Sequence, residues 1–436
     1  MAPPLEERFY ETQRAQLLRW LPWLHLFRAF RIALDVRKIL LGTLAAIALY
    51  AGDALIDALP FAPQQAGESG TPLIYLHDLS WKAGGVQLNV DDLPFANSGE
   101  SPDIWPRVLR PISSVVNPGA RLFQRGNSWA DAGYAWTQLL FRLAVWSLLG
   151  GAIARMAAVQ FARRESLTAW SAMRFSTARF GTTIGAPLLP LVFIGFFWVV
   201  CLLLGLIGRI PEFGPTIVGT LWFVPLLIGI VLAVILLVIA VSWPLMVATI
   251  STEGTDAFDA LSRGYDYVLN RTGYALWLLF LTVIYGAIVL LLAGAVTNGA
   301  VQLAQWSVGS SMGDQLQELT PLQSPLPGDP TQVGESGALG FAGSAAAFWV
   351  RGLSWLLQGL EISFFWTATA IVYLLLRLSL DAKPLDEVYV PASERKNELP
   401  LVGIAASEQR EQERAESTGE SSDSAQSSEA PQSTDS

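Results

Sequence analysis

Long runs of apolar residues alternate with polar, arginine-bearing segments along this chain. About 20 apolar residues are needed to cross a hydrocarbon core that is roughly 30 Å thick. Between Leu226 and Val241 no side chain is polar, so this run is the clearest example. Together the runs predict an all-α integral membrane protein with six transmembrane helices, at residues 39–59, 135–159, 184–207, 221–248, 274–296 and 353–376.

The composition agrees with this pattern. Of 436 residues, 52% are hydrophobic and only 15% are charged. A water-soluble chain of this length could not cover its surface with so few charges, so apolar side chains must also face lipid. We therefore expect one membrane domain at residues 39–377, in place of several soluble domains.

The lysines and arginines predict the orientation of these helices. Seven of them precede the first run, and the segments after the second, fourth and sixth runs also carry arginines. Residues 297–347 contain no Lys or Arg, whereas the longer loop at 60–133 contains five. Cytoplasmic segments are enriched in these residues. The distribution therefore predicts that residues 60–133 and 297–347 are outer loops and that both termini are cytoplasmic. The six helices would then form three outward-and-return hairpins in a bacterial cytoplasmic (inner) membrane.

The two ends of the chain differ in character. Residues 1–38 are basic and predict a cytoplasmic amphipathic segment leading into an uncleaved signal-anchor, because the first apolar run starts only near Ile39. Residues 378–436 form a cytoplasmic tail, in which the stretch from Ser407 holds eight acidic residues against Arg410 and Arg414. The tail has too few apolar side chains to offset the loss of chain entropy, so we expect it to be disordered.

Two related segments follow the second and fourth runs. A shift of 88 residues aligns Glu165 with Glu253 and Trp170 with Phe258, and the segments end on Arg174 and Arg263. In the second segment Phe258, Leu261, Tyr265 and Val268 recur at spacings of three and four, which predicts an amphipathic surface helix. A weaker third copy lies at residues 29–37. Either these are ordinary surface helices with chance similarity, or the chain repeats a unit of surface helix plus hairpin.

Three stretches carry a resemblance to known proteins: residues 150–155 (GGAIAR), 243–246 (WPLM) and 253–268. They are similar to a family of bacterial polytopic membrane proteins of uncharacterised function. More loosely, the plan of span, amphipathic helix and span resembles the membrane domain attached to some glycerophosphodiester phosphodiesterases. The resemblance covers mainly residues 135–296. It implies a membrane domain and no reaction, because the hydrolase chemistry of those relatives belongs to a separate soluble domain.

A few polar side chains fall inside the predicted helices: Asp53, Asp57, Gln138, Arg142 and Glu361. Charges in hydrocarbon are costly, so they normally pair or face water. We predict that Arg142 contacts Asp53 or Glu361 in another helix. The alternatives are that these residues mark shifted helix ends, or that they line a path for a proton or solute.

No cofactor or metal site is predicted. The chain has one cysteine, Cys201, and two histidines, His25 and His77, which lie far apart. A His/Cys metal cluster is therefore excluded, and no phosphate-binding glycine motif occurs. His77 is followed by Asp78, but no nucleophile elbow accompanies them. Nothing is basic and aromatic enough for nucleic acid.

These absences favour a non-enzymatic membrane component that acts in assembly, scaffolding or regulation. Besides the lipid bilayer, its partners would be membrane proteins that bind the surface helices or the acidic tail. The alternative is a permease or transport accessory built on Asp53, Arg142 and Glu361. An enzyme acting on lipid at the membrane surface is a third hypothesis.

Overall fold

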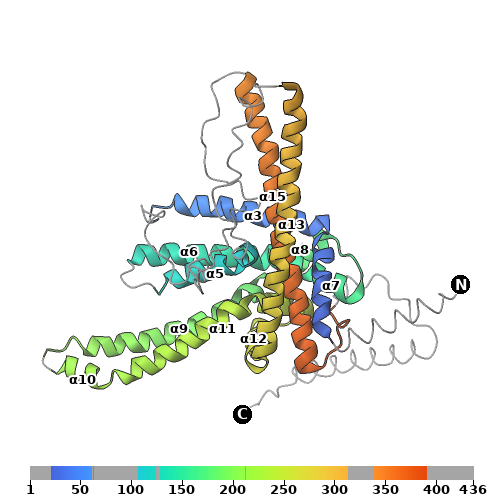
Figure 1. The fold of residues 1–436 in the computed structure, drawn as a ribbon. Coiled ribbons are helices and arrows are strands. Elements are labelled where there is room, and N and C mark those ends of the chain that lie inside the picture. The colour runs from blue at the N-terminus through green and yellow to red at the C-terminus, as the bar shows by residue number, and fades with distance from the viewer. Residues whose placement is uncertain are drawn as a thin grey trace, which may run out of the picture. The chain divides into compact units, whose positions relative to one another are not determined.

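The computed structural model describes residues 21–60, 62, 107–123, 128–211, 213–312 and 338–389. The chain divides into two units, Met1–Val388 and Tyr389–Ser436, and the fold below is that of the first unit. Every regular element among the described residues is a helix. Six helical segments are long and apolar enough to cross a membrane, as the sequence predicts (Figure 1).

Five of these segments are single helices: α3 (Val36–Asp57), α9 (Phe180–Ile207), α11 (Phe223–Glu253), α13 (Thr272–Met312) and α15 (Ala338–Asp381). The other is continuous through three elements, α6 (Trp129–Val145), the π-helical turn η3 (Trp146–Gly150) and α7 (Gly151–Arg163). Shorter helices precede or connect them: η1 (Pro22–Phe27), α2 (Arg28–Ala33), α5 (Arg110–Arg121), α8 (Ala169–Ala178), α10 (Gly214–Thr220) and α12 (Ala257–Asn270).

Local sequence signals set several helix ends. The Asp35 side chain accepts a hydrogen bond from the Arg37 amide at the start of α3, and Asp256 does the same for Asp259 in α12. Such caps satisfy amide groups that have no partner within the helix. At the C-terminal end of α11, Gly254 has a φ of 66°, a left-handed conformation that glycine adopts without steric cost.

Helices extend into both of the predicted outer loops. Helix α13 continues to Met312 and α15 begins at Ala338, so both ends of the predicted loop at 297–347 are helical. The other loop, 60–133, contains α5 and the first residues of α6. Hydropathy predicts where a helix leaves the hydrocarbon, but backbone hydrogen bonding continues wherever no residue breaks the helix. The remaining loop residues lie outside the described ranges.

The predicted tail also begins too early. Helix α15 extends to Asp381, and Val388 is buried. Arg377 donates hydrogen bonds to the carbonyl oxygens of Pro384 (3.0 Å) and Glu387 (2.6 Å), which holds the chain after the helix in place. The prediction of a disordered tail at 378–436 is therefore wrong for its first residues. Residues 390–436 lie outside the described ranges, as do residues 1–20 of the predicted amphipathic segment.

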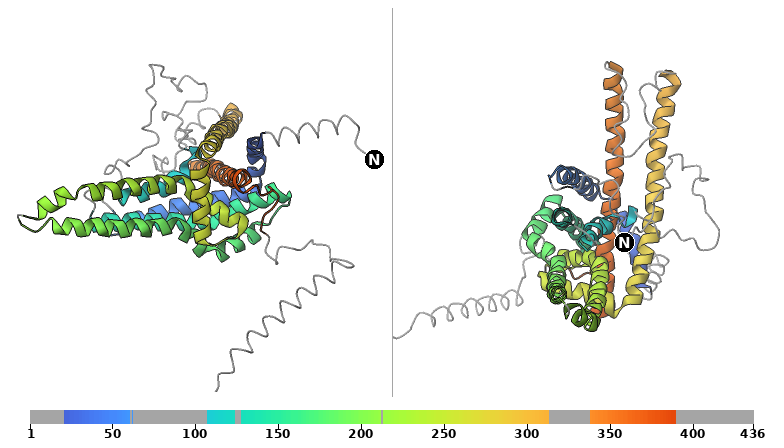
Figure 2. Two further views of the ribbon diagram at one scale, coloured as in Figure 1. Left: turned by 90° about the horizontal axis from the view of Figure 1, so that it is seen from below. Right: turned by 90° about the vertical axis from the view of Figure 1, so that its left-hand side faces the viewer.

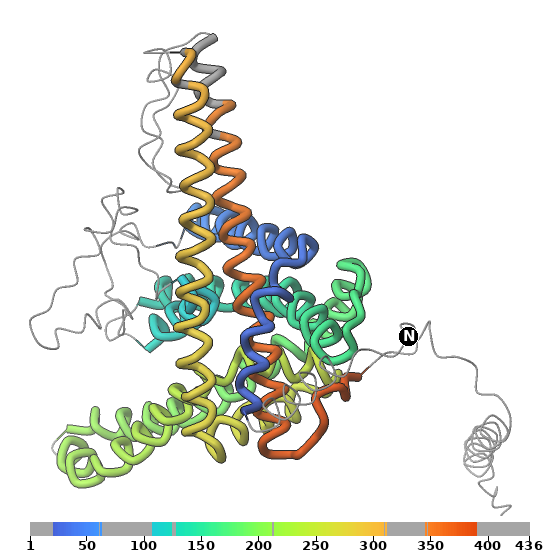
Figure 3. Tube along the Cα trace, turned by 45° about the vertical axis from the view of Figure 1, so that its right-hand side comes forward, coloured from blue at the N-terminus to red at the C-terminus, as the bar shows by residue number. Residues whose placement is uncertain are grey.

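Helix α15 is central to the packing, since it contacts α3, α7, α11 and α13 (Figure 3). Its closest neighbour is α3. A Cβ atom on Gly42 would overlap the carbonyl oxygen of Gly359, and one on Gly359 would overlap Thr43. The two backbones therefore approach so closely that only glycine fits at either position, a mode of packing typical of membrane helices.

Three tryptophans occupy the middle of this core. Trp146, Trp243 and Trp366 are almost completely buried. The ring centre of Trp366 lies 5.8 Å from that of Trp146 and 5.7 Å from that of Trp243. Gly150, at the end of the π-helical turn, leaves room for the indole of Trp366, because a Cβ there would meet the ring. The large rings thus join the second, fourth and sixth apolar segments.

Helices α9 and α11 form a separate pair. They lie side by side, and α10 packs against α9 at their far end (Figure 2). In α9, and in α11 before Val238, more than half of the residues are exposed, including Phe196, Trp198 and Leu237. Only the part of α11 from Val238 onward joins the core.

Candidate functional site: two clusters of charged side chains

The first cluster lies between α3 and α6 and contains Asp53, Asp57, Tyr134, Gln138 and Arg142; we call it the α3–α6 cluster. Arg142 and Asp53 form an ion pair in which the closest nitrogen–oxygen distance is 3.0 Å. Both carboxylate oxygens of Asp53 accept from the same guanidinium nitrogen. The predicted contact of Arg142 with Asp53 is therefore confirmed.

Helix α5 completes the surroundings of Arg142. The guanidinium donates a hydrogen bond of 2.8 Å to the carbonyl oxygen of Ser114, and the hydroxyl of the same serine accepts from the indole of Trp146. Helix α5 falls in a stretch that the sequence analysis treats as an outer loop. Its role in fixing Arg142 was not predicted, because no pattern in the sequence indicates which loop helix returns to the bundle.

The rest of this cluster is a chain of hydrogen bonds. Tyr134 donates to Asp57, and Gln138 donates to the Tyr134 hydroxyl at 2.8 Å. Arg121 of α5 donates to the Gln138 side-chain oxygen at 3.3 Å. Asp53 and Asp57 are four residues apart on one face of α3, and both meet α6, as their spacing suggests.

Glu361 does not join this cluster. Its carboxylate lies 3.5 Å from a guanidinium nitrogen of Arg110 in α5. The side chain of Glu361 is 7% exposed and that of Arg110 is 52% exposed, so the pair reaches from the interior to the surface. Arg142 therefore pairs with Asp53, and Glu361 has a partner that the sequence analysis did not name.

The second cluster lies where α11, α12 and α15 meet and contains Glu253, Arg263, Tyr373 and Arg377; we call it the α11–α15 cluster. Glu253 forms ion pairs with Arg263 and with Arg377, the latter at 3.2 Å. Tyr373 donates a hydrogen bond of 2.7 Å to the same carboxylate. One carboxylate thus joins the end of α11 to two other helices.

Helix α12 adds to this cluster. Arg263 also pairs at 3.0 Å with Asp259, which lies four residues earlier on the same helix. Burial lowers the pKa of Arg263, but the Asp259 hydrogen bond and the Glu253 carboxylate outweigh it and raise the pKa. Burial and a hydrogen bond to Asp381 raise the pKa of Tyr267, which stays protonated and donates at 2.6 Å. Arg263 therefore stays charged and Tyr267 stays neutral at neutral pH, which makes both poorly suited to proton transfer.

The repeated segments form helices α8 and α12 with matching details. Thr168 and Asp256, which are 88 residues apart, both cap their helices through a side-chain oxygen. Ala172 and Ala260 are completely buried at equivalent positions. Trp170 is 80% exposed and Phe258 is 72% exposed, so each helix presents one large aromatic side chain near its first turn.

This placement changes the predicted apolar face of α12. The buried side consists of Ala260, Gly264, Tyr267 and Val268, whereas Phe258 points away from it. Small residues allow α12 to pack closely on α11, because a Cβ on Gly264 would press on a Met246 side chain. In the first copy Glu165 and Arg174 are exposed and lie outside both clusters.

Three further charged side chains are buried, and no sequence pattern predicts their burial. Arg155 is fully buried, lies 4.5 Å from the ring centre of Phe175 and donates to the Ser251 carbonyl oxygen. Lys38 is also fully buried and donates to Gln160 and to the Ile32 carbonyl oxygen. Arg377 belongs to the α11–α15 cluster. In the sequence, these residues lie near the ends of the apolar runs, and pairing between distant helices leaves no local pattern.

Among the described residues, no group of three or more His, Cys, Asp and Glu side chains is arranged to hold a metal ion. Comparison with known proteins adds no relative: no family model matches the chain, and neither do curated proteins or solved structures.

Proposed function

We propose that this chain is a non-enzymatic membrane component that acts in assembly, scaffolding or regulation. One observation carries the proposal: Asp53, Arg142 and Glu361, the charged side chains deepest in the apolar segments, each form an ion pair with a side chain from another helix. Charges engaged in this way hold helices together. A transported solute or a reacting group would have to displace them.

The topology belongs to the same proposal. Six helices would cross a bacterial inner membrane as three outward-and-return hairpins, with both termini in the cytoplasm. The contacts of α3 with α6, of α9 with α11, and of α13 with α15 support this pairing. Cysteines introduced at positions 100 and 320 should react with a membrane-impermeant thiol reagent only from outside the cell. Labelling from the cytoplasm alone would refute this orientation.

The repeated helices α8 and α12 would be amphipathic surface helices at the cytoplasmic boundary. The exposed aromatic rings of Trp170 and Phe258 suit either the headgroup region or a partner protein. Because both occupy the same position of the repeat, we propose that the unit of surface helix and hairpin is duplicated. The family resemblance found in the sequence is compatible with a membrane domain of this type.

The test of an assembly role is purification of the full chain at its native expression level after cross-linking. A partner held at fixed stoichiometry should be lost when Trp170 and Phe258 are both changed to Ser, or when residues 390–436 are removed. It should be retained in the control Arg174→Gln, which alters an exposed residue of the same helix without removing an aromatic ring. A chain that carries no stoichiometric partner in its own membrane would contradict the proposal.

One observation favours the transport alternative: Glu361 is nearly buried, yet its partner Arg110 is half exposed. An ion or solute arriving from that side could compete for the carboxylate. Transport predicts a solute that raises the thermal stability of the purified chain in a saturable manner, and loss of that effect in Glu361→Gln. The assembly proposal predicts that no solute acts through Glu361.

A further inference from the structure

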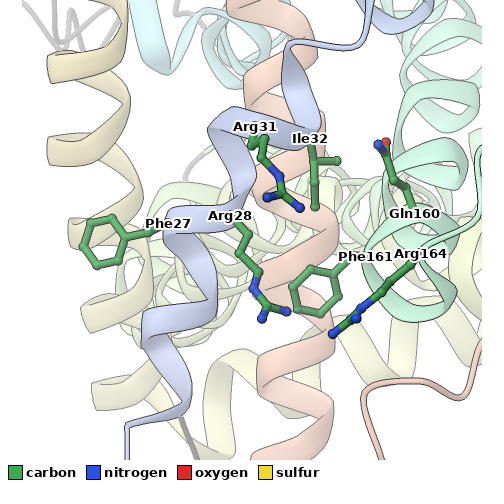
Figure 4. A pocket seen from close by; sticks show the side chains of 7 residues that line it. All are labelled: Phe27, Arg28, Arg31, Ile32, Gln160, Phe161 and Arg164. Atoms are coloured by element: carbon green, nitrogen blue, oxygen red, sulfur yellow. The ribbon is translucent and has the colours of Figure 1, made fainter. Parts of the chain in front are cut away.

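A pocket opens between η1, α2 and the end of α7. Its lining consists of Phe27, Arg28, Arg31, Ile32, Gln160, Phe161 and Arg164 (Figure 4). The volume is about 480 Å³, within the range of about 300 to 1,000 Å³ typical of small-molecule sites. Three of the seven side chains are guanidinium groups, and none is acidic.

The charges in this pocket point to an anion. Figure 4 shows the Arg28 side chain, from α2, and the Arg164 side chain, from the residue that follows α7, both reaching toward the Phe161 ring. The Arg31 guanidinium lies above them, beside Ile32. Neither Arg31 nor Arg164 forms an ion pair with a carboxylate of the described residues. Guanidinium groups bind phosphate oxygens in pairs of parallel hydrogen bonds, so converging arginines are suited to a phosphoryl group.

The buried Lys38 holds two walls of the pocket together. The side-chain oxygen of Gln160 accepts a hydrogen bond from the buried ammonium group of Lys38. Lys38 also donates to the Ile32 carbonyl oxygen, which connects the pocket wall on α2 to the wall on α7.

The backbone of Arg164 adds a second kind of observation. This residue has a φ of 60°, a left-handed conformation that is unfavourable for a side chain as large as arginine. The residue that ends α11 in the same conformation is Gly254, which bears no such cost. Ala382, which directly follows α15, has a left-handed φ of 51° as well, so this conformation accompanies helix ends in this chain. Here the strained position carries one of the three guanidinium groups.

The position of the pocket identifies the source of the phosphate. Helix α3 begins at Val36 and the second apolar segment ends at Arg163, so the pocket lies at the ends of two candidate membrane spans. Phe27, Ile32 and Phe161 form an apolar wall beside the arginines. A phosphate group attached to apolar chains matches this combination, and basic pockets between membrane helices bind such headgroups.

We propose that this pocket binds the phosphate headgroup of an anionic phospholipid, with Arg31 and Arg164 as its donors. A lipid held there would join η1 and α2, which precede the first apolar segment, to the end of the second. The site is independent of the proposed function, since it uses none of the residues in the α3–α6 and α11–α15 clusters.

The experiment measures thermal unfolding of the full chain in neutral detergent with added phosphatidylglycerol, phosphatidylcholine or inorganic phosphate. We expect a saturable rise of the unfolding midpoint with phosphatidylglycerol and none with phosphatidylcholine. Each of Arg31→Gln and Arg164→Gln should weaken the apparent affinity about fivefold, as expected for one basic group at a membrane surface. The control Arg174→Gln removes an exposed arginine of α8 outside the pocket and should leave the affinity unchanged.

Arg164→Gly separates binding from folding. Glycine relieves the strained conformation, so the midpoint without lipid should not fall, while the response to phosphatidylglycerol should weaken as in Arg164→Gln. Equal responses to both lipids, or equal losses in Arg174→Gln, would overturn the proposal. An arginine-dependent response to inorganic phosphate alone would overturn the lipid source. If removal of residues 390–436 lowered the midpoint without lipid, and Arg31→Gln and Arg164→Gln abolished that effect, the occupant would be the acidic tail and the proposal would be wrong.

Discussion

The pair formed by α9 and α11 contrasts with the core around α7 and α15. Of the six candidate spans, α9 and α11 are the two most apolar. They are also the two least buried, with 11% of the apolar stretch buried in α9 and 6% in α11. The corresponding share is 72% for the segment containing α7 and 89% for α15, although both are less apolar. In a water-soluble protein the most apolar helix would be the most buried.

This inversion has a physical cause. Lipid chains are as apolar as leucine, so a helix gains little by exchanging lipid for another helix through hydrophobicity alone. Association depends on close packing of small residues and on polar contacts that lipid cannot satisfy. The core accordingly holds Gly42 against Gly359 and the charges of both clusters, whereas α9 contains no charged side chain.

The largest expected effect comes from closing the glycine contact. Gly359→Val would force α3 and α15 apart and should lower the free energy of unfolding by about 3 kcal/mol. The matched changes Gly352→Val in the same helix and Gly229→Val in α11 meet open space and should have little effect. Equilibrium unfolding in mild detergent measures all three. Similar losses in the three variants would show that the core and the α9–α11 pair do not differ in this way.

A second variant removes one charge from the core. Glu253→Gln leaves Arg377, whose side chain is 2% exposed, without its carboxylate and should lower stability by about 2 kcal/mol. The equivalent position of the repeat supplies the control, since Glu165 is exposed and Glu165→Gln should cost less than about 0.5 kcal/mol. If both variants lose the same stability, the α11–α15 cluster does not hold the core together.

The ion pair of the α3–α6 cluster should contribute less, because Asp53 is 34% exposed. Asp53→Arg and Arg142→Asp should each lower stability by about 1 kcal/mol through the loss of the partner. The double exchange restores opposite charges and should recover part of that loss. A double variant as unstable as the sum of the two single variants would show that the pair does not interact.

The smallest effect is a dependence on pH in the mildly acidic range. Burial and the nearby charge of Arg28 lower the pKa of His25 in η1. The unfolded chain then binds a proton more readily than the folded one, so stability should fall as the pH drops below the ordinary histidine value of about 6.5. Unfolding midpoints between pH 7.5 and 5 should show this decline, and His25→Gln should flatten it. An unchanged decline in His25→Gln would assign the effect to other groups.

Features set by residues that are close together in the sequence could be predicted, whereas most contacts between residues far apart in the chain could not. The number of apolar segments, the caps of α3 and α12 and the pair of Asp259 with Arg263 follow from neighbouring residues, and all were predictable. The contact of Arg142 with Asp53 was predicted only as one of two options, because depth in the membrane restricts partners without selecting one. The partner of Glu361 lies in α5, inside a stretch that hydropathy treats as a loop.

The sequence by itself determined that this protein is helical and has six apolar segments, because the thickness of the hydrocarbon and the need to satisfy every backbone hydrogen bond act on each segment separately. It also places Trp170 and Phe258 at matching positions of two similar segments. Only the tertiary structure decided which apolar helices form the core, that Lys38 and Arg377 are buried, and that three arginines converge on one pocket. Those outcomes depend on shape and charge pairing between residues more than 100 positions apart, which no local pattern records.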